Sequence, residues 1–154
     1  MSALDELYQD VIFDHHRHPR NKRPCPDCSL RGTGENPLCG DNLELGVSLD
    51  GGRIAEVSFE GHGCAISQAS ASMMTEAVAG LTVEEALALG DSLRRMIRGE
   101  RASRDLGDLH ALEGISRYPV RIKCALLPWT TLEQVLAAPA PTVTPSLESA
   151  EKEA

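Results

Sequence analysis

The chain has 154 residues, of which 42% are hydrophobic, which is enough for one globular core and too little for two. A formal net charge of -8 and an aromatic content of only 3% exclude the cationic or stacking surfaces that nucleic-acid partners need, so we expect no such partner. No apolar run approaches the ~20 residues of a membrane span, and acidic residues at 5, 6 and 10 replace the basic start of a signal peptide; we therefore expect a cytoplasmic protein with no membrane partner.

The first predicted elements are a helix, a loop and a hairpin. Apolar residues recur every three or four positions before Pro19, which predicts an amphipathic helix that ends there. From Pro19 to Pro37 the sequence is rich in Pro, Gly, Asn and basic residues, so we expect mostly loop with a short edge strand near 30–32. Apolar residues then alternate over 43–49 and 55–59, which predicts a β-hairpin around the intervening Asp-Gly-Gly.

Helical spacing returns after the hairpin. One helix is expected over 64–79, closed by Gly80. Thr82 and Glu85 are spaced as a capping box, in which each side chain bonds the other residue's backbone N–H. A second helix is therefore expected to begin there and to end at Gly99.

The last part of the domain is predicted as a short apolar segment at 109–115 and a final helix. Pro119 is suited to the first position of that helix, where its missing N–H costs nothing. Residues 139–154 are rich in Pro, Ser, Thr and Glu without periodicity, which predicts a disordered tail after a single domain over 1–138. The order of elements predicts an α+β fold, in which a small antiparallel sheet (the hairpin plus the edge strand) packs against several helices.

Five cysteines, an odd number, in a chain expected to be cytoplasmic indicate metal binding or thiol chemistry rather than a disulfide framework. Cys39 and Asp41 flank Gly40, and residues two apart in extended backbone point to one side, so both side chains can reach one ion. Cys64 lies at the start of a predicted helix, where the helix dipole lowers the pKa of a thiol.

The fifth cysteine, Cys124, lies next to two cations, Arg121 and Lys123, which favour the thiolate or simply solvate a helix face. Taken alone, Cys124 is also typical of a core cysteine. None of the spacings among Cys39, Cys64 and Cys124 is the C-x2-C of zinc fingers, so the spacings leave a metal site and buried cysteines both open.

Three segments, residues 36–41, 61–74 and 107–129, resemble in order and separation the SufU branch of the IscU-like, NifU N-terminal-like family of iron–sulfur cluster assembly proteins. The resemblance covers nearly everything except the tail and implies an IscU/SufE-like fold with a bound Zn2+. It places the family's metal ligands at four positions: Cys39, Asp41, Cys64 and Cys124. It also makes Cys39 the sulfur acceptor.

Two features favour the SufU branch over cluster scaffolds of the IscU type. Scaffolds carry a His immediately before the third Cys, where this chain has Lys123, and a shorter link than the 60 positions from Cys64 to Cys124. The resemblance therefore implies a zinc-dependent sulfurtransferase that works in a relay rather than as a stand-alone enzyme. Cys39 would take persulfide sulfur from a pyridoxal-phosphate cysteine desulfurase of the SufS type and pass it to downstream iron–sulfur assembly proteins.

Three alternatives use the same residues. The first is a scaffold that holds iron or a [2Fe–2S] cluster in place of zinc. The second is a structural zinc domain for protein contacts, in which Cys39 has no role in sulfur transfer. A hydrolytic zinc enzyme, the third, is disfavoured because four protein ligands leave no open position for water.

Cys25 and Cys28 form a C-x2-C pair outside the resemblance. We expect an exposed loop with two free thiols; the alternatives are a redox pair and an accessory metal contact. His62 is close to Cys64 and is expected to be a solvated loop histidine rather than a transient ligand. A polar or cationic role at the end of the first helix is expected for three residues: His15, His16 and His18.

Overall fold

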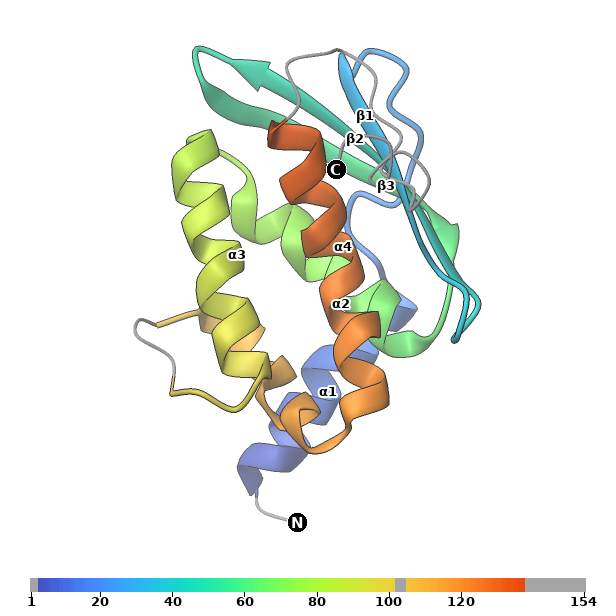
Figure 1. Cartoon of the computed structure of the whole chain (residues 1–154), viewed down its shortest axis with the longest axis vertical. Helices are drawn as coiled ribbons and strands as arrows, with labels where there is room; N and C mark the ends of the chain where they lie inside the picture. Colours follow the sequence, from blue (N-terminus) through green and yellow to red (C-terminus); the bar gives the residue numbers. More distant parts are fainter. Residues whose placement is uncertain (1–2, 102–104, 138–154) are drawn as a thin grey trace, which may run out of the picture.

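The computed structural model describes residues 3–101 and 105–137. In these residues a three-stranded antiparallel sheet lies against four α-helices and a 3-10 helix (Figure 1), which is the predicted α+β architecture. The predicted tail, 139–154, and the domain boundary at 138 lie outside the described residues. No helix in the described part of the chain is long and apolar enough to cross a membrane.

The sheet consists of β1 (Leu30–Asn36), β2 (Asp41–Asp50) and β3 (Arg53–His62), hydrogen-bonded in that order. Gly51 and Gly52 join β2 to β3 with φ of 61° and 80°, the left-handed conformation that a tight two-residue hairpin turn requires. The predicted hairpin is therefore present. The edge strand is also present, although it continues to residue 36 because it pairs with β2 along its whole length.

The helices are α1 (Ala3–Arg17), α2 (Ala65–Val78), α3 (Val83–Ile97), the 3-10 helix η1 (Gly107–Arg117) and α4 (Pro119–Ala137). Pro119 opens α4 as expected. The capping box at the start of α3 is formed: the Glu85 N–H donates to Thr82 Oγ1 at 3.1 Å, and the Thr82 N–H donates to Glu85 Oε1 at 2.9 Å.

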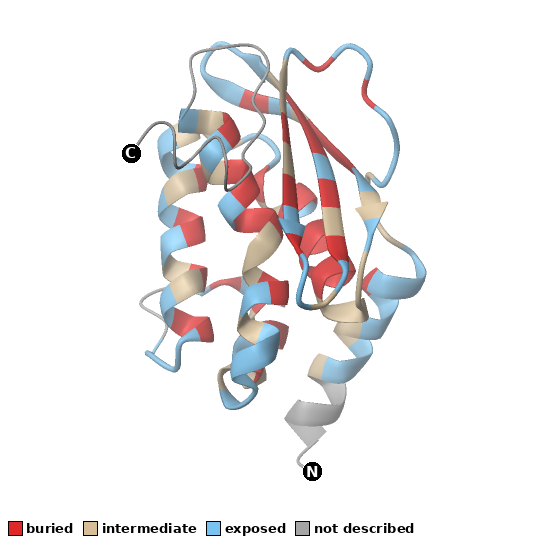
Figure 2. Cartoon of the chain, turned by 45° about the vertical axis from the view of Figure 1, so that its right-hand side comes forward, coloured by how far each residue is buried: buried red, intermediate tan, exposed pale blue. Residues whose placement is uncertain are grey.

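The core lies between the helical face of the sheet and the helices (Figure 2). Helix α2 is central to it and is joined to α4 by polar contacts inside the core. Trp129 Nε1 donates to Ser70 Oγ at 3.2 Å, and Ser70 Oγ donates to the Ala125 carbonyl at 2.6 Å. These bonds fix α4 against α2 next to Cys124, which determines where that thiol lies.

His15 differs from the prediction. It is in the last turn of α1, as expected, but only 2% of it is exposed, and its Nδ1 lies 2.7 Å from Ser72 Oγ on α2. The periodicity of α1 could not show that α2 covers this turn. His15 is thus a buried link between two helices rather than a solvated helix-end group, whereas His16 and His18 are exposed.

Burial lowers the pKa of His15, with the nearby Arg20 as a second cause. The folded chain therefore binds this proton less readily than the unfolded chain, so the free energy of unfolding should fall as the pH drops below the ordinary histidine value of about 6.5. His15→Asn should reduce this slope, measured by urea unfolding at a series of pH values. His16→Asn, on the exposed side of the same turn, is the control, and equal slopes in the two variants would contradict the assignment.

Candidate metal centre

Cys39 and Asp41 are positioned by the turn between β1 and β2. The Cys39 N–H donates to the Asn36 carbonyl at 3.1 Å, which closes the turn. Gly40 follows with φ of 69°, a left-handed conformation that costs glycine little and other residues more. This bend leaves Cys39 half-buried at the turn, while Asp41, the first residue of β2, is only 2% exposed.

The buried Asp41 carboxylate lies at the N-terminus of α2. Its Oδ1 accepts from the Cys64 N–H at 2.9 Å and from Ser67 Oγ at 3.2 Å, and its Oδ2 accepts from Asn36 Nδ2 at 3.5 Å. Because helix N-terminal N–H groups and the helix dipole favour a negative charge, these partners compensate the burial of the carboxylate. Sequence reasoning gave Ser67 and Asn36 no role, although a serine three residues after a predicted cap position is a usable signal.

Gly63 permits this arrangement. A Cβ at residue 63 would lie 2.4 Å from Asp41 Oδ1 and 2.6 Å from Ser67 Oγ, both far inside van der Waals contact. The glycine is needed because the Asp41 carboxylate and the Ser67 hydroxyl come close to its Cα. It is not needed for a left-handed backbone, since Gly63 is not among the glycines with positive φ.

Three predicted ligands come together. One ligand atom each from Cys39, Asp41 and Cys124 lies within 4.8 Å of the others, and the two sulfurs are 3.3 Å apart. A tetrahedral zinc ion, with bonds of about 2.0–2.3 Å, separates its ligand atoms by roughly 3.3–3.8 Å. The donor set, two soft thiols and a carboxylate, therefore fits zinc in both spacing and chemistry.

Cys64 is next to these three atoms but is used differently in the structure. It is the N-cap of α2, where its sulfur accepts from the Ser67 N–H at 3.5 Å, and it is outside the group of three. Its thiol is still close enough to raise the pKa of Cys124. Its role as a fourth ligand stays a prediction.

The chain matches a family model described as NifU-like N terminal domain over residues 7–125. It belongs to this family. Over 136 residues it is 47% identical to the zinc-dependent sulfurtransferase SufU of Bacillus subtilis, covering 87% of this chain and 92% of that protein. Over 142 residues it is 41% identical to the iron–sulfur cluster assembly scaffold protein IscU of Streptococcus pyogenes serotype M1, covering 88% and 86%.

A solved structure from Fervidobacterium islandicum AW-1, described as an iron–sulfur cluster assembly scaffold protein for the SUF system, has the same fold. The TM-score is 0.80 at 36% identity, over 85% of this chain and 97% of that one. The predicted membership of the SufU and IscU-like family and the predicted fold are thus confirmed.

The charge environment of the candidate metal centre is set by burial of Cys124 and by the nearby Arg121. Burial is the main cause that raises the pKa of the Cys124 thiol, followed by its hydrogen bond to Cys39. The pKa of Arg121 is raised by a hydrogen bond to Cys124 and by the charges of the three free cysteines. Of the two roles left open by the sequence, the position of Arg121 beside Cys124 suits the one in which the cation favours a thiolate, although burial raises the pKa of Cys124 itself.

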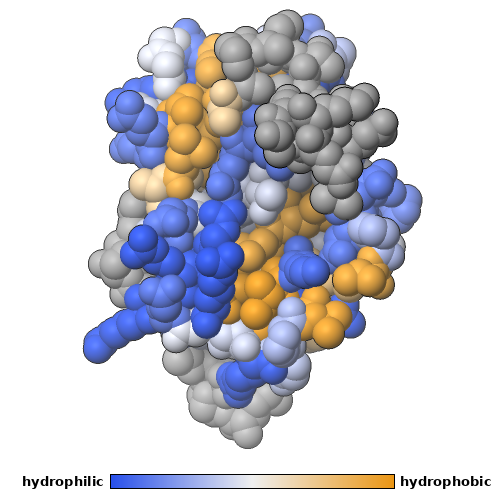
Figure 3. All heavy atoms as spheres, viewed as in Figure 1, coloured by the Kyte–Doolittle hydropathy of each residue, from blue (hydrophilic) through white to orange (hydrophobic). Residues whose placement is uncertain are grey.

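Apolar side chains flank the centre. Large hydrophobic side chains that are more than half exposed in the described residues are Leu38 (79%), Tyr118 (59%) and Val120 (69%). Leu38 precedes Cys39, and the other two lie at the start of the segment that carries Cys124. In Figure 3 hydrophobic side chains gather over α4 and toward the β1–β2 turn, beside a hydrophilic band. Such a grouping is typical of a protein-docking face.

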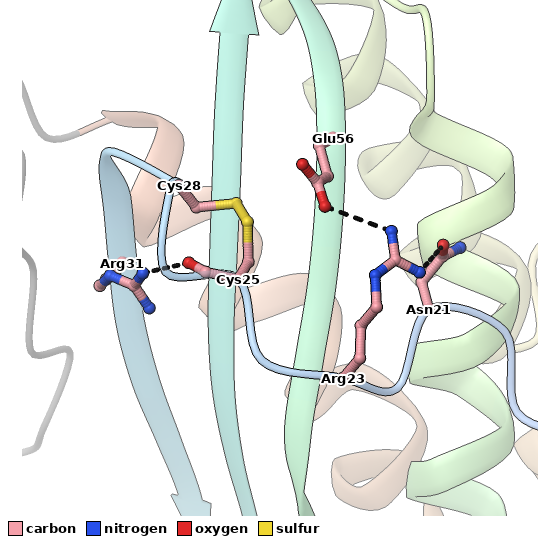
Figure 4. The surroundings of a disulfide bond; sticks show 6 residues. All are labelled: Asn21, Arg23, Cys25, Cys28, Arg31 and Glu56. Atoms are coloured by element: carbon pink, nitrogen blue, oxygen red, sulfur yellow. Dashed lines mark hydrogen bonds and ion pairs between the residues drawn. A yellow bond between two sulfur atoms is a disulfide. The ribbon is translucent and has the colours of Figure 1, made fainter.

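Cys25 and Cys28 lie elsewhere, and the expectation for them was wrong. They form a disulfide and are only 6% and 4% exposed, rather than two free thiols in an exposed loop (Figure 4). The reason is Gly46 on β2, whose missing side chain lets both cysteines pack against the sheet. His62 is exposed at the end of β3 with its ring beside the Asn42 amide, in agreement with a solvated histidine, although in a strand rather than a loop.

Proposed function

We propose that the chain is a zinc-dependent sulfur acceptor in iron–sulfur cluster assembly, which takes persulfide sulfur onto Cys39 from a pyridoxal-phosphate cysteine desulfurase of the SufS type. The observation that carries the proposal is the half-buried Cys39 thiol on an apolar-flanked turn, 3.3 Å from the sulfur of Cys124. The 47% identity to a zinc-dependent sulfurtransferase supports it.

Zinc would be held by Cys39, Asp41 and Cys124, and by Cys64 after a rotation of its side chain away from the α2 cap. When bound, zinc supplies positive charge that keeps the thiols deprotonated and shielded from oxidation. The Asp41 carboxylate is already suited to be a ligand, because one of its oxygens lies within 4.8 Å of both the Cys39 and the Cys124 sulfur while hydrogen bonds at the α2 N-terminus hold the group in place.

In the transfer itself, the Cys39 thiolate attacks the terminal sulfur of the desulfurase persulfide. The S–S bond of that persulfide breaks, the desulfurase cysteine leaves as a thiolate, and Cys39 becomes the persulfide. Arg121, whose guanidinium interacts with the cluster of thiols, would offset negative charge that develops in this cluster during the transfer. The flanking Leu38 and Val120 would contact the desulfurase.

Asp41→Ala separates the role of Asp41 in holding zinc from the role of Cys39 in accepting sulfur. The variant is incubated with the desulfurase and labelled cysteine, and zinc and protein-bound sulfur are measured on the same sample. Removing the carboxylate leaves every sulfur in place, so we expect weaker zinc retention with measurable sulfur transfer. Wild-type zinc retention would exclude Asp41 as a ligand.

The same residues also suit a scaffold, the function in the names of the IscU relatives. Anaerobic reconstitution with iron and sulfide separates the two functions. A stable cluster that transfers to an apo-acceptor would establish the scaffold, whereas tightly retained zinc with sulfur uptake on Cys39 would establish the acceptor.

Removing zinc should destabilise the fold, because the ligands come from three separate segments of the chain. Zinc at about 1,000 times its Kd contributes about 4 kcal/mol, so we expect the Tm to drop by on the order of 10 °C after chelation. Thermal melts before and after verified zinc removal measure this, with zinc re-addition as the control. An unchanged melt would contradict a contribution of zinc to stability.

A further inference from the structure

The Cys25–Cys28 loop covers the face of the sheet that the helices leave open. Leu45 and Val47 of β2 are buried in the core, and since side chains alternate along a strand, Gly46 belongs to the opposite face. A Cβ on Gly46 would lie 3.2 Å from Cys28 Cβ and 3.4 Å from Cys25 Cβ, so the loop rests directly on this strand.

This loop is separate from the centre around Cys39. Cys28 precedes β1 by two residues and Cys39 follows its end by three, so the seven residues of β1 lie between them. At about 3.3 Å per residue, β1 separates the two regions by roughly 20 Å. Nothing in the proposed sulfur transfer uses Cys25 or Cys28.

A carboxylate on β3 completes a second group of ligand atoms. One atom each from Cys25, Cys28 and Glu56 lies within 4.8 Å of the other two. C-x2-C is the spacing with which zinc-binding loops present two thiolates to one ion, and a carboxylate oxygen is an accepted third ligand. Glu56 is ion-paired with Arg23 at 3.2 Å, a pair exposed enough to water to be weak and to be displaced by a metal ion.

A reductant would reach the disulfide through a cleft of about 220 Å³ that Cys25 lines together with Arg23 and Arg31, although Cys25 itself is only 6% exposed. Glu44 and Glu60 line the same cleft, so their carboxylates balance the two guanidinium groups and leave no net charge that would repel an incoming thiolate.

We propose that reduction of the Cys25–Cys28 disulfide creates a second metal site, in which the two thiolates and Glu56 bind a thiophilic divalent cation such as Zn2+, with water as the fourth ligand. A dithiol reductant supplies two electrons and two protons as its own sulfurs become a disulfide. The Cys25–Cys28 S–S bond breaks to give two thiols, and metal binding then releases both thiol protons to water. The disulfide and the metal-bound state exclude one another, so occupancy of the site follows the thiol redox state.

The test uses the full chain with Zn2+ as the probe. Protein treated with a phosphine reductant, and untreated protein, are equilibrated with zinc, freed of excess, and analysed for zinc per chain. We expect the reduced wild type to hold one zinc more than the oxidised wild type. Cys25→Ser/Cys28→Ser should show no such difference while keeping the zinc of the Cys39 centre. An equal zinc content of reduced and oxidised wild type would overturn the proposal, as would an extra zinc that persists in the double variant.

A second pair of variants tests the carboxylate without removing a cysteine. Glu56→Gln should weaken binding of the second zinc at least about tenfold. Glu60→Gln is the matched control, because Glu60 lines the same cleft but is not in the group of three ligand atoms. Equal affinities of these two variants for the second zinc would show that Glu56 is not a ligand and would overturn the proposed site.

Discussion

Replacing Cys39 with serine is expected to reduce sulfur transfer from a cysteine desulfurase to background. A serine hydroxyl is not ionised at neutral pH and does not displace a persulfide sulfur, so the nucleophile is lost. The turn should survive, because it is closed by the backbone N–H of residue 39 and by Gly40 rather than by the thiol. The remaining ligands and a water should still hold some zinc.

The measurement is protein-bound sulfur after incubation with desulfurase and labelled cysteine, with zinc determined on the same sample. Cys25→Ser/Cys28→Ser serves as the control, since it also replaces cysteines, here a disulfide pair, but about 20 Å away from the centre. It should be labelled like the wild type. Labelling of Cys39→Ser at the wild-type rate would assign the acceptor to another thiol, Cys64 or Cys124 first.

Gly63→Ala is expected to destabilise the fold and to weaken metal binding together. The new Cβ would overlap Asp41 Oδ1 and Ser67 Oγ, so the carboxylate must leave the N-terminus of α2. Overpacking of this kind costs about 1–3 kcal/mol, and the loss of the hydrogen bonds that the buried carboxylate accepts from the Cys64 N–H and the Ser67 hydroxyl adds to it. For a chain of this size the Tm should fall by roughly 2–4 °C per kcal/mol.

Thermal melts and zinc content of Gly63→Ala test both effects. Gly114→Ala is the control, because its Cβ would meet only the end of the Arg117 side chain at 3.4 Å, an ordinary contact. A wild-type zinc content in Gly63→Ala would show that the Asp41 position does not matter for the metal.

Elements with local signals could be predicted from the sequence. The hairpin turn at Gly51 and Gly52, the capping box at Thr82 and Pro119 at the start of α4 each depend on residues close to one another in the chain, and all three were found as expected. The family resemblance and the fold it implied were confirmed for the same reason: the motifs are contiguous segments.

What the sequence could not provide depends on packing between distant segments. His15 is buried because α2 covers the last turn of α1, and the cysteines at 25 and 28 are buried because a glycine in β2 faces them. The orientation of the Cys64 sulfur depends on whether it contacts the Ser67 N–H or the neighbouring thiols. Sequence spacing does not determine geometry at this scale.

The bond between the Asp41 carboxylate and the Cys64 N–H has a consequence for folding kinetics. It closes a segment of only 23 residues, within the hairpin and the start of α2, whereas Cys124 reaches Cys39 across 85. Because loop-closure entropy grows with length, the Asp41 half of the centre should form early in folding and the Cys124 half late. Interactions that form only after the folding transition state change the unfolding rate and not the folding rate. Because zinc needs the late-forming Cys124 half, we expect bound zinc mainly to slow unfolding of the chain and to leave its refolding rate nearly unchanged.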